Sequence, residues 1–425
     1  MPPLTPPTSR RDFLVAGSAV AASTLVGGGV HAAGNDVIKI GLIGCGGRGT
    51  GAAVNALKAD KNVKLIAMAD AFSDRLESSL GQISKQFGAK VEVPNSNKFT
   101  GFEGYLGVLN SGVDLVILAT PPHFRPAHLR ACLEAKKHVF CEKPIAVDPV
   151  GVRSVIATAE EFKKQGLSLV SGFCYRYDLA KRETIKRIHG GDIGDIVTMQ
   201  INYNTGPIWH KGKDPKWGPM ETQLRNWYYY TWLSGDHIVE QHVHNFDKAS
   251  WVMNGVMPIA ATGVGGRQVR TDPKYGNIYD HHAIAFEYAN GVRLYSFCRQ
   301  QKGCQDDVSD HIFGSRGSAE LMSHKITGDK KWQYEGEAPN MYQVEHDELF
   351  AAIRAGKILN DGVSAAYSTM MSILGRMAVY TGQRVTWDFA LNQSKLDLTP
   401  AKYDMNAEMP AVFSEIAIPG ETKLV

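Results

Sequence analysis

The stretch Val37–Gly49, VIKIGLIGCGGRG, decides the fold. Its first part is an apolar run broken only by Lys39, which indicates a buried strand, and a helical pattern begins at Ala52, just after the glycines. In such a unit the first glycine permits a tight turn, the second lets the backbone approach a pyrophosphate, and the third lets the helix pack on the strand. The helix N-terminus then offers free N–H groups to the phosphates. The sequence therefore predicts a dinucleotide-binding loop formed by Gly44, Cys45, Gly46, Gly47, Arg48 and Gly49.

An acidic residue stands at the end of the next apolar run. Asp70 follows Val63–Ala69, where a carboxylate can accept hydrogen bonds from the hydroxyls of a bound ribose. Because the same carboxylate repels a 2′-phosphate, the sequence favours NAD over NADP. Arg48 and Arg75 are able to reach a phosphate, so NADP stays open as an alternative.

The first half of the chain alternates buried strands with helical patterns. This alternation predicts an α/β fold with a doubly wound parallel sheet over residues 34–150. Beyond the first two strands, the expected strands are Val113–Ala119, His138–Cys141 and Leu167–Gly172, and the expected helices are Ser73–Phe87, Pro126–Lys136 and Val150–Lys164.

The second half predicts a different domain, over residues 151–390, followed by an extended arm over 391–425. Its strand patterns are separated by turn signals, the clearest being Ala289-Asn290-Gly291. The expected strands are Ile196–Tyr203, Ala283–Tyr288, Val292–Phe297 and one entered near Ser315–Leu321, and the expected helices are Glu345–Gly356 and Ala365–Thr381.

Two segments carry candidate catalytic groups. Glu142-Lys143-Pro144 follows a parallel strand, at the edge where open α/β sheets place their ligands, and the ammonium of Lys143 can hydrogen-bond a substrate hydroxyl. On a helix, Glu240, His244 and Asp247 fall on one face. A carboxylate one turn from an imidazole is expected to raise the pKa of the imidazole and orient it as a general base.

Taken together, these motifs resemble the Gfo/Idh/MocA family of glucose–fructose oxidoreductases and inositol dehydrogenases. The resemblance rests on the glycine loop, Ala119-Thr120-Pro121-Pro122 with His128, Glu142-Lys143-Pro144, Gly172–Tyr177 and His244–Asp247. It implies a Rossmann domain joined to an α+β domain whose open, mostly antiparallel sheet builds homodimers or homotetramers.

The resemblance also implies roles for single residues. Lys143 would contact the substrate hydroxyl and the nicotinamide ribose, and His244 would be the acid/base. Thr120, Pro121, His123 and Glu142 would join the cofactor site. The chain departs from the family at Glu240, where Asp is frequent, and at His242, where Gly is usual; the larger His242 is expected to reshape the pocket.

An aromatic cluster between the domains suggests a sugar-binding surface. Trp227 could stack on the apolar face of a sugar ring while Arg225 binds hydroxyls, and Arg176 and Asp247 are further candidate substrate contacts. Ordinary core or interface packing is an equal alternative for these aromatics. The cluster comprises Trp209, Trp217, Trp227, Tyr228, Tyr229, Tyr230 and Trp232.

Three classes of function are compatible with these motifs. The first is an oxidoreductase acting on a hydroxyl of a sugar, cyclitol or glycoside with NAD. The second is an NAD-dependent glycosidase, in which oxidation is transient and Tyr175 removes a C–H proton. The third is a non-catalytic ligand-binding protein, against which the retention of Lys143 and His244 argues.

The first residues predict export. Ser9–Leu14 (SRRDFL) is typical of a twin-arginine signal, and an apolar stretch leads from it to a small-residue cleavage zone near Val30–Ala33. We therefore expect a leader over residues 1–33, the twin-arginine machinery as a partner, and a periplasmic or other extracytoplasmic location in a bacterium. Because no nicotinamide pool exists there, the cofactor is expected to be tightly bound and recycled within each catalytic cycle.

Composition excludes several other classes. The formal net charge is +3 without a basic block, so neither nucleic acid nor an anionic membrane is expected as a partner. After the leader, no apolar run approaches a membrane span. Asp280-His281-His282 could join Glu240 and His244 at a metal, but no zinc-type spacing links them, so no metal is expected.

Overall fold

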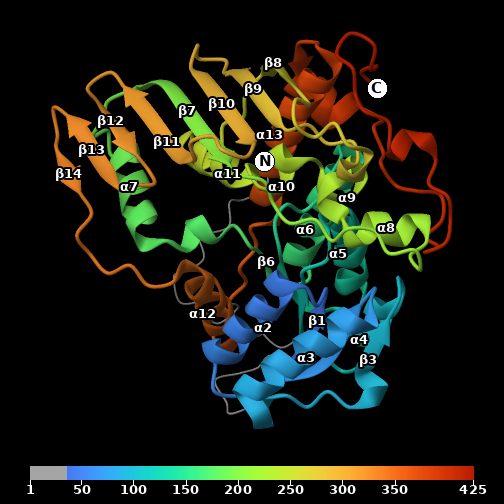
Figure 1. Ribbon diagram of the computed structural model, residues 1–425. Coiled ribbons are helices and arrows are strands. Elements are labelled where there is room, and N and C mark those ends of the chain that lie inside the picture. Colours follow the sequence, from blue (N-terminus) through green and yellow to red (C-terminus); the bar gives the residue numbers. More distant parts are fainter. Residues whose placement is uncertain (1–35) are drawn as a thin grey trace, which may run out of the picture.

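The computed structural model describes residues 36–425, which form two β-sheets and the helices that cover them (Figure 1). The predicted export leader, residues 1–33, lies outside the described residues. No helix among those described is both long and apolar enough to cross a membrane.

The first sheet is the predicted doubly wound parallel sheet. Its six strands lie in the order β3-β2-β1-β4-β5-β6, all parallel. The order reverses between β1 and β4, and their carboxyl ends form the switch point where such sheets bind ligands. The strands are β1 (Ile38–Ile43), β2 (Val63–Asp70), β3 (Lys98–Thr100), β4 (Leu115–Leu118), β5 (His138–Cys141) and β6 (Leu169–Ser171).

Helices cover both faces of this sheet, as expected for buried parallel strands. The helix Ser73–Phe87 has the bounds that the sequence predicts, because its apolar stripe is regular. The sixth strand, β6, comes from beyond residue 150, so the parallel sheet uses chain on both sides of that position. The helices are α2 (Gly47–Ala59), α3 (Ser73–Phe87), α4 (Gly104–Asn110), α5 (Arg125–Glu134) and α6 (Pro149–Lys164).

The second sheet has nine strands in the order β14-β13-β12-β11-β7-β10-β9-β8-β15. Only β7 and β10 pair in parallel, so the sheet is mostly antiparallel, as predicted. Its strands are β7 (Ile196–Thr205), β8 (Ala260–Gly266), β9 (His281–Glu287), β10 (Arg293–Gln300), β11 (Asp307–Gly314), β12 (Gly317–Glu320), β13 (Lys325–Gly328), β14 (Trp332–Gln333) and β15 (Val385–Thr386).

One face of this sheet packs on helices that connect it to the first domain (Figure 1). These include α11 (Val243–Val252) and α13 (Gly362–Thr381), while α12 (Met341–Arg354) returns to pack on α2. The remaining helices are α7 (Leu179–His189), α8 (Pro219–Arg225), α9 (Thr231–Ser234) and α10 (His237–Glu240), with 3-10 turns at Gly88–Lys90, Asn95–Asn97, Pro122–Phe124, Cys174–Tyr177, Trp227–Tyr229, Pro273–Tyr275 and Ala411–Phe413 and a π turn at Phe389–Gln393.

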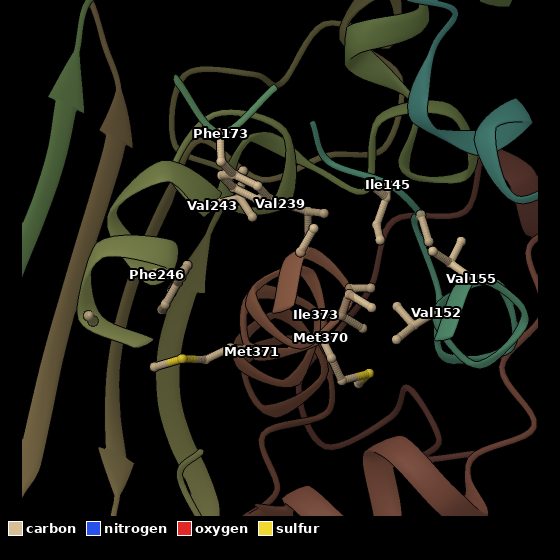
Figure 2. Packing of buried hydrophobic residues seen from close by; sticks show 14 of the residues in the cluster. Ile145, Val152, Val155, Phe173, Val239, Val243, Phe246, Met370, Met371 and Ile373 are labelled. Carbon is tan, nitrogen blue, oxygen red and sulfur yellow. The ribbon is translucent and has the colours of Figure 1, made fainter. Parts of the chain in front are cut away.

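Helix α13 lies at the centre of a core shared by both sheets. Figure 2 shows Met371 directed toward Phe246 of α11, and Met370 toward Val152 of α6. All four side chains are fully buried, and each contributes about 1.5–3 kcal/mol relative to an exposed side chain. The two domains are therefore held by one continuous apolar interior, which fixes residues 240–247 of the second domain relative to the first.

Candidate functional site

A cavity of about 710 Å³ opens at the carboxyl ends of the parallel strands, where the strand order reverses. It brings together the glycine loop, Asp70, Lys143, Glu240 and His244, which come from both domains. Other lining residues are Phe72, Arg75, Phe102, Tyr105, Thr120, Pro121, Phe124, Arg125, His128, Glu142, Gly172, Tyr203, Trp209, Lys211, Leu224, Arg225, Trp227, Gln241 and Tyr342.

The glycine loop has the geometry of a pyrophosphate cradle. Gly44 has φ +94, and a Cβ on it would stand 2.5 Å from the backbone of Thr120. A Cβ on Gly49 would stand 1.9 Å from the carbonyl oxygen of Gly44, so helix and strand can approach only with glycine there. By contrast, no described residue outside the immediate chain comes within 4 Å of a Cβ built on Gly46, the N-cap of α2. The first N–H groups of α2 therefore face open space that fits a dinucleotide phosphate.

Asp70 ends β2 at the rim of this cradle. Its carboxylate accepts hydrogen bonds from the N–H groups of Cys45 (2.7 Å) and Phe72 (2.9 Å). Burial raises the pKa of Asp70, and these two bonds partly oppose the shift. The predicted cofactor contact Cys45 does not line the cavity, because its buried thiol turns to the carbonyl of Ala69 (3.3 Å). Cys45 thus contributes to the site by the hydrogen bond from its backbone N–H to Asp70.

The loop after β4 lines the cavity through Thr120 and Pro121, two of the predicted cofactor contacts. His123 was predicted to join them, but its imidazole lies against the hydroxyl of Tyr403 in the C-terminal arm (2.7 Å), outside the cavity lining. Arg125, for which the sequence predicts no role, donates from Nη2 to the carbonyl of Thr120 (2.7 Å) and from Nη1 to that of Pro144. It joins the two loops of the site, and a single arginine before a proline gives no sequence signal for that role.

Lys143 is held in the cavity by the second domain. Its Nζ donates to the main-chain oxygen of Glu240 (2.6 Å) and to Glu240 Oε1 (3.2 Å). The neighbouring Glu142 pairs with Arg48 of the glycine loop, and Arg48 also donates to Glu345 of α12 (2.9 Å). This chain of ion pairs ties the glycine loop to the segment that carries Lys143.

His244 lies in the first turn of α11 and is 9% exposed. Burial lowers its pKa well below the usual range, and the charges of Lys143 and Lys248 lower it further. The imidazole is therefore neutral at neutral pH. The expectation that Glu240 raises the pKa of His244 is wrong, because the helix breaks between α10 and α11 and the carboxylate of Glu240 pairs with Lys143 instead.

Tyr175 lies behind His244 instead of in the cavity lining. The two rings meet edge to face with centroids 5.2 Å apart. The ammonium groups of Lys248 and Lys181 lie 4.5 Å and 4.8 Å from the centroid of the Tyr175 ring. Burial raises the pKa of Tyr175, which disfavours the phenolate that a base would need. The structure thus places this residue as support for His244.

Arg176 and Asp247, both predicted to bind substrate, bind each other. The guanidinium of Arg176 donates to Asp247 Oδ2 (2.8 Å) and Oδ1 (2.9 Å), and Ser368 of α13 donates to the same carboxylate (2.8 Å). Neither residue lines the cavity. The pair fixes the Cys174–Tyr177 turn to α11 and α13.

His242 does not reshape the pocket, contrary to the expectation. It is fully buried outside the cavity lining, and its Nε2 lies 2.8 Å from the hydroxyl of Ser296 in the second sheet.

The aromatic cluster divides between the two interpretations. Trp209 and Trp227 line the cavity, with ring centroids 6.1 Å apart, whereas the Tyr228–Tyr230 run and Trp232 are buried in a separate apolar cluster. Arg225 also lines the cavity, but its guanidinium pairs with Glu221 (2.7 Å) and with Asp74 (3.2 Å) beyond Asp70. It therefore lies toward the Asp70 end of the cavity.

Comparison with known proteins agrees with this geometry. A family model described as "Oxidoreductase family, NAD-binding Rossmann fold" matches residues 38–170, and one described as "GFO/IDH/MocA C-terminal domain" matches residues 182–320. The chain belongs to the GFO/IDH/MocA family. The resemblance inferred from the motifs is thus confirmed, and the cavity lies on an NAD-binding domain.

Individual relatives of the family are distant. Myo-inositol 2-dehydrogenase of Thermotoga maritima is 27% identical over 218 residues, which cover 51% of this chain and 55% of that protein, so the chain spans about half the length of this relative. Inositol 2-dehydrogenase of Rhizobium meliloti is 23% identical, with 77% of this chain and 93% of that protein covered. A levoglucosan dehydrogenase solved with NADH and levoglucosan has a TM-score of 0.64 at 16% identity, covering 83% and 99% of the two chains, and shows the shared fold.

Proposed function

We propose that the protein oxidises a ring hydroxyl of a sugar, cyclitol or glycoside with NAD. The observation that carries this proposal is that Lys143 and a neutral His244 open into the same cavity as the glycine loop and Asp70. Relatives named inositol dehydrogenases support the substrate class.

The chain's own groups account for the proton half of the reaction. Bound NAD supplies the hydride acceptor, and Gly44–Gly49 with Asp70 would hold it. His244, neutral because it is buried, accepts the hydroxyl proton as the C–O bond becomes a carbonyl. Lys143 donates a hydrogen bond to the same oxygen, and Glu240 orients the ammonium through two contacts.

The part of the cavity wall that the second domain supplies suits a polyhydroxylated ring. Trp209 and Trp227 offer apolar faces, while Lys211 and Gln241 offer polar groups beside them. Stacking on aromatic faces combined with hydrogen bonds at the edges is the chemistry that recognises a sugar or cyclitol ring.

We also propose that the protein is exported folded by the twin-arginine route, as the SRRDFL sequence at residues 9–14 indicates, and that NAD travels with it. A cofactor that cannot exchange with a pool must be reoxidised on the protein, so a second carbonyl substrate is required. Denaturing protein purified without added cofactor and identifying the released nucleotide by mass spectrometry tests this; a nucleotide-free preparation contradicts tight binding.

The reaction itself is tested on the same preparation. Absorbance in the reduced-nicotinamide band is followed while cyclitols, sugars and glycosides are added, and the masses of the products are determined by mass spectrometry. A lasting rise with a product two hydrogens lighter supports the dehydrogenase. Release of an aglycone without net reduction of the cofactor contradicts the dehydrogenase and supports an NAD-dependent glycosidase. Binding of a ligand without either change contradicts both enzymes and supports a ligand-binding protein.

A further inference from the structure

A second cluster of reactive side chains is buried beneath the catalytic segment. Asp236 and His237 begin α10, and His282 lies in β9 of the second sheet. Their side chains are 0%, 1% and 2% exposed. One potential ligand atom from each residue lies within 4.8 Å of those of the other two. Residues 46 positions apart in the chain thus converge in a water-excluded interior.

The imidazoles of this cluster lack the partners that buried polar groups normally have. Among residues 36–425, His237 Nε2 and His282 Nδ1 are buried without a hydrogen-bond partner, and His282 Nε2 makes no well-directed hydrogen bond although it lies 3.3 Å from Asp236 Oδ2. Leaving a buried polar group unpaired costs on the order of 1–3 kcal/mol. Such a concentration of unpaired nitrogens around one carboxylate calls for a ligand that accepts their lone pairs.

Asp236 is fixed in a conformation that directs its carboxylate into the cluster. Its backbone has φ +75, a region that non-glycine residues rarely adopt. Oδ1 accepts a hydrogen bond from His237 Nδ1 (2.7 Å), and Oδ2 accepts from the N–H of Tyr279 (2.9 Å) and the hydroxyl of Tyr380 (2.6 Å). A metal ion that replaced the proton between His237 Nδ1 and Asp236 would meet an imidazole nitrogen and a carboxylate oxygen that already face each other.

We propose that Asp236, His237 and His282 bind one divalent transition-metal ion of the zinc class. Zn²⁺ ligands at about 2.0–2.2 Å in a tetrahedron are separated by about 3.4 Å, and His282 Nε2 already lies 3.3 Å from Asp236 Oδ2. Two imidazoles and one carboxylate suit zinc and its neighbours, whereas calcium and magnesium prefer oxygen ligands.

Neighbouring cations limit the charge of the ion that fits. The guanidinium of Arg376 donates to the carbonyl of Gly235 (2.9 Å), and that of Arg270 donates to the carbonyl of Tyr279 (2.5 Å). These positive groups disfavour trivalent ions, while the carboxylate compensates part of a divalent charge. The ion would join α10, which ends at Glu240, to β9, and so fix the segment that orients Lys143.

The test measures metal in tag-free, full-length protein purified in chelator-treated buffers. Inductively coupled plasma mass spectrometry is expected to find about one transition-metal ion per chain. His282→Ala should lower this content at least about tenfold. The matched control is His281→Ala, the adjacent residue of β9, whose half-exposed imidazole pairs with Asp280 and points away from the cluster; it should retain the ion.

A second measurement decides the matter without a variant. Metal-stripped wild-type protein is titrated with Co²⁺, which in a tetrahedral nitrogen–oxygen site gives visible absorption bands that added Zn²⁺ abolishes. Wild-type protein that neither carries a metal nor develops these bands overturns the proposal, as does folded His282→Ala with unchanged metal content. Neither readout depends on dehydrogenase activity, so the proposed function and the metal site can fail separately.

Discussion

The charge state of His244 is set by burial and by two lysines, not by Glu240. Glu240, one helical turn earlier, is taken up by Lys143, while burial and two lysines keep the imidazole neutral. A neutral imidazole can accept a proton, whereas an imidazolium cannot. The same burial that lowers the pKa therefore prepares the residue to act as a base.

Removing this imidazole separates chemistry from cofactor binding. For His244→Ala we expect turnover to fall by about 10²–10⁴-fold, the usual contribution of a general base. NAD affinity should stay near that of the wild type, because the glycine loop and Asp70 are untouched. Single-turnover absorbance measures the first quantity and calorimetric titration with NAD the second. Loss of NAD binding together with turnover would contradict the assignment.

Asp70 should set the choice between the two dinucleotides. Asp70→Ala removes the carboxylate that repels a 2′-phosphate, and Arg75 remains in the cavity lining. We expect the NADP-to-NAD affinity ratio to rise about tenfold, equivalent to ~1.4 kcal/mol. Titration of cofactor-free protein with each dinucleotide measures this. Glu77→Ala on the same helix, whose carboxylate pairs with Lys98, is the control and should leave the ratio unchanged.

Single residues were predictable where chemistry is local. The glycine loop, Asp70, Lys143 and His244 all lie in the cavity, because strand ends and helix starts fix their positions. Roles that depend on distant partners were not predictable. Arg176 and Asp247 neutralise each other, and Asp236 meets His282 only through the packing of α10 on the second sheet, so no spacing pattern revealed either pair.

At the scale of elements, glycines mark where strand and helix must touch. In Gly49→Ala the new methyl group would overlap the carbonyl oxygen of Gly44. We expect a loss of more than ~2 kcal/mol of unfolding free energy, as for other overpacked sites, together with loss of NAD binding. Gly81→Ala, in exposed α3 where nothing lies within 4 Å, should instead stabilise by about 0.5–1 kcal/mol. Urea unfolding of both variants checks the contrast, and equal effects would contradict it.

The start of α13 carries a carboxyl group that opposes folding at high pH. Asp361 accepts a hydrogen bond from the N–H of Ser171 (2.7 Å), yet burial raises its pKa to about 7. The folded state therefore prefers the protonated form. The stability that the protonated carboxyl contributes is complete below the pKa that Asp361 has in the unfolded chain. It is lost as the pH rises through the folded-state pKa of about 7.

Asp361→Asn keeps the accepting oxygen without the charge. The unfolding free energy of the variant minus that of the wild type should increase by on the order of 2 kcal/mol when the pH is raised from 5 to 8. Urea unfolding at the two pH values measures this gain. Asp60→Asn is a control for which the opposite effect on unfolding free energy is expected. Pairing with Arg354 lowers the pKa of Asp60, so removing this carboxylate should destabilise the protein. A gain that does not change with pH contradicts the assignment.

Elements themselves were predicted closely where their periodicity is regular, as for α3 and β5. The main error was the helix assumed to carry Glu240, His244 and Asp247 on one face. The turn at Gln241–His242, where the N–H of His242 bonds to the carbonyl of His237 instead of that of Ile238, divides that segment into α10 and α11. At this break Glu240 contacts Lys143 and His242 contacts Ser296 of the second sheet, and no local propensity records such contacts between distant residues.

On the scale of the whole molecule, the second sheet is buried on one face and open on the other. The pairing of β10 with its neighbours places Tyr295, Phe297, Phe313 and Val264 on the open face, and each is more than a third exposed. A run of large apolar side chains in the middle strands of a sheet is typical of an interface between subunits. We therefore expect a homodimer or homotetramer built on this face.

Charges placed on that face should separate the subunits. In the double variant Tyr295→Glu/Phe297→Glu, we expect light scattering after size-exclusion chromatography to give the mass of a single chain, because burying unpaired carboxylates at an interface costs several kcal/mol. Val256→Glu changes an equally exposed apolar residue outside the sheet and should leave the mass unchanged. If both variants keep the wild-type mass, subunits meet elsewhere. Helices α10 and α11 pack on the opposite, buried face of the sheet, so the substitutions should leave them in place. The separated chains should therefore still bind NAD. Retained NAD binding distinguishes a loss of assembly from a loss of fold.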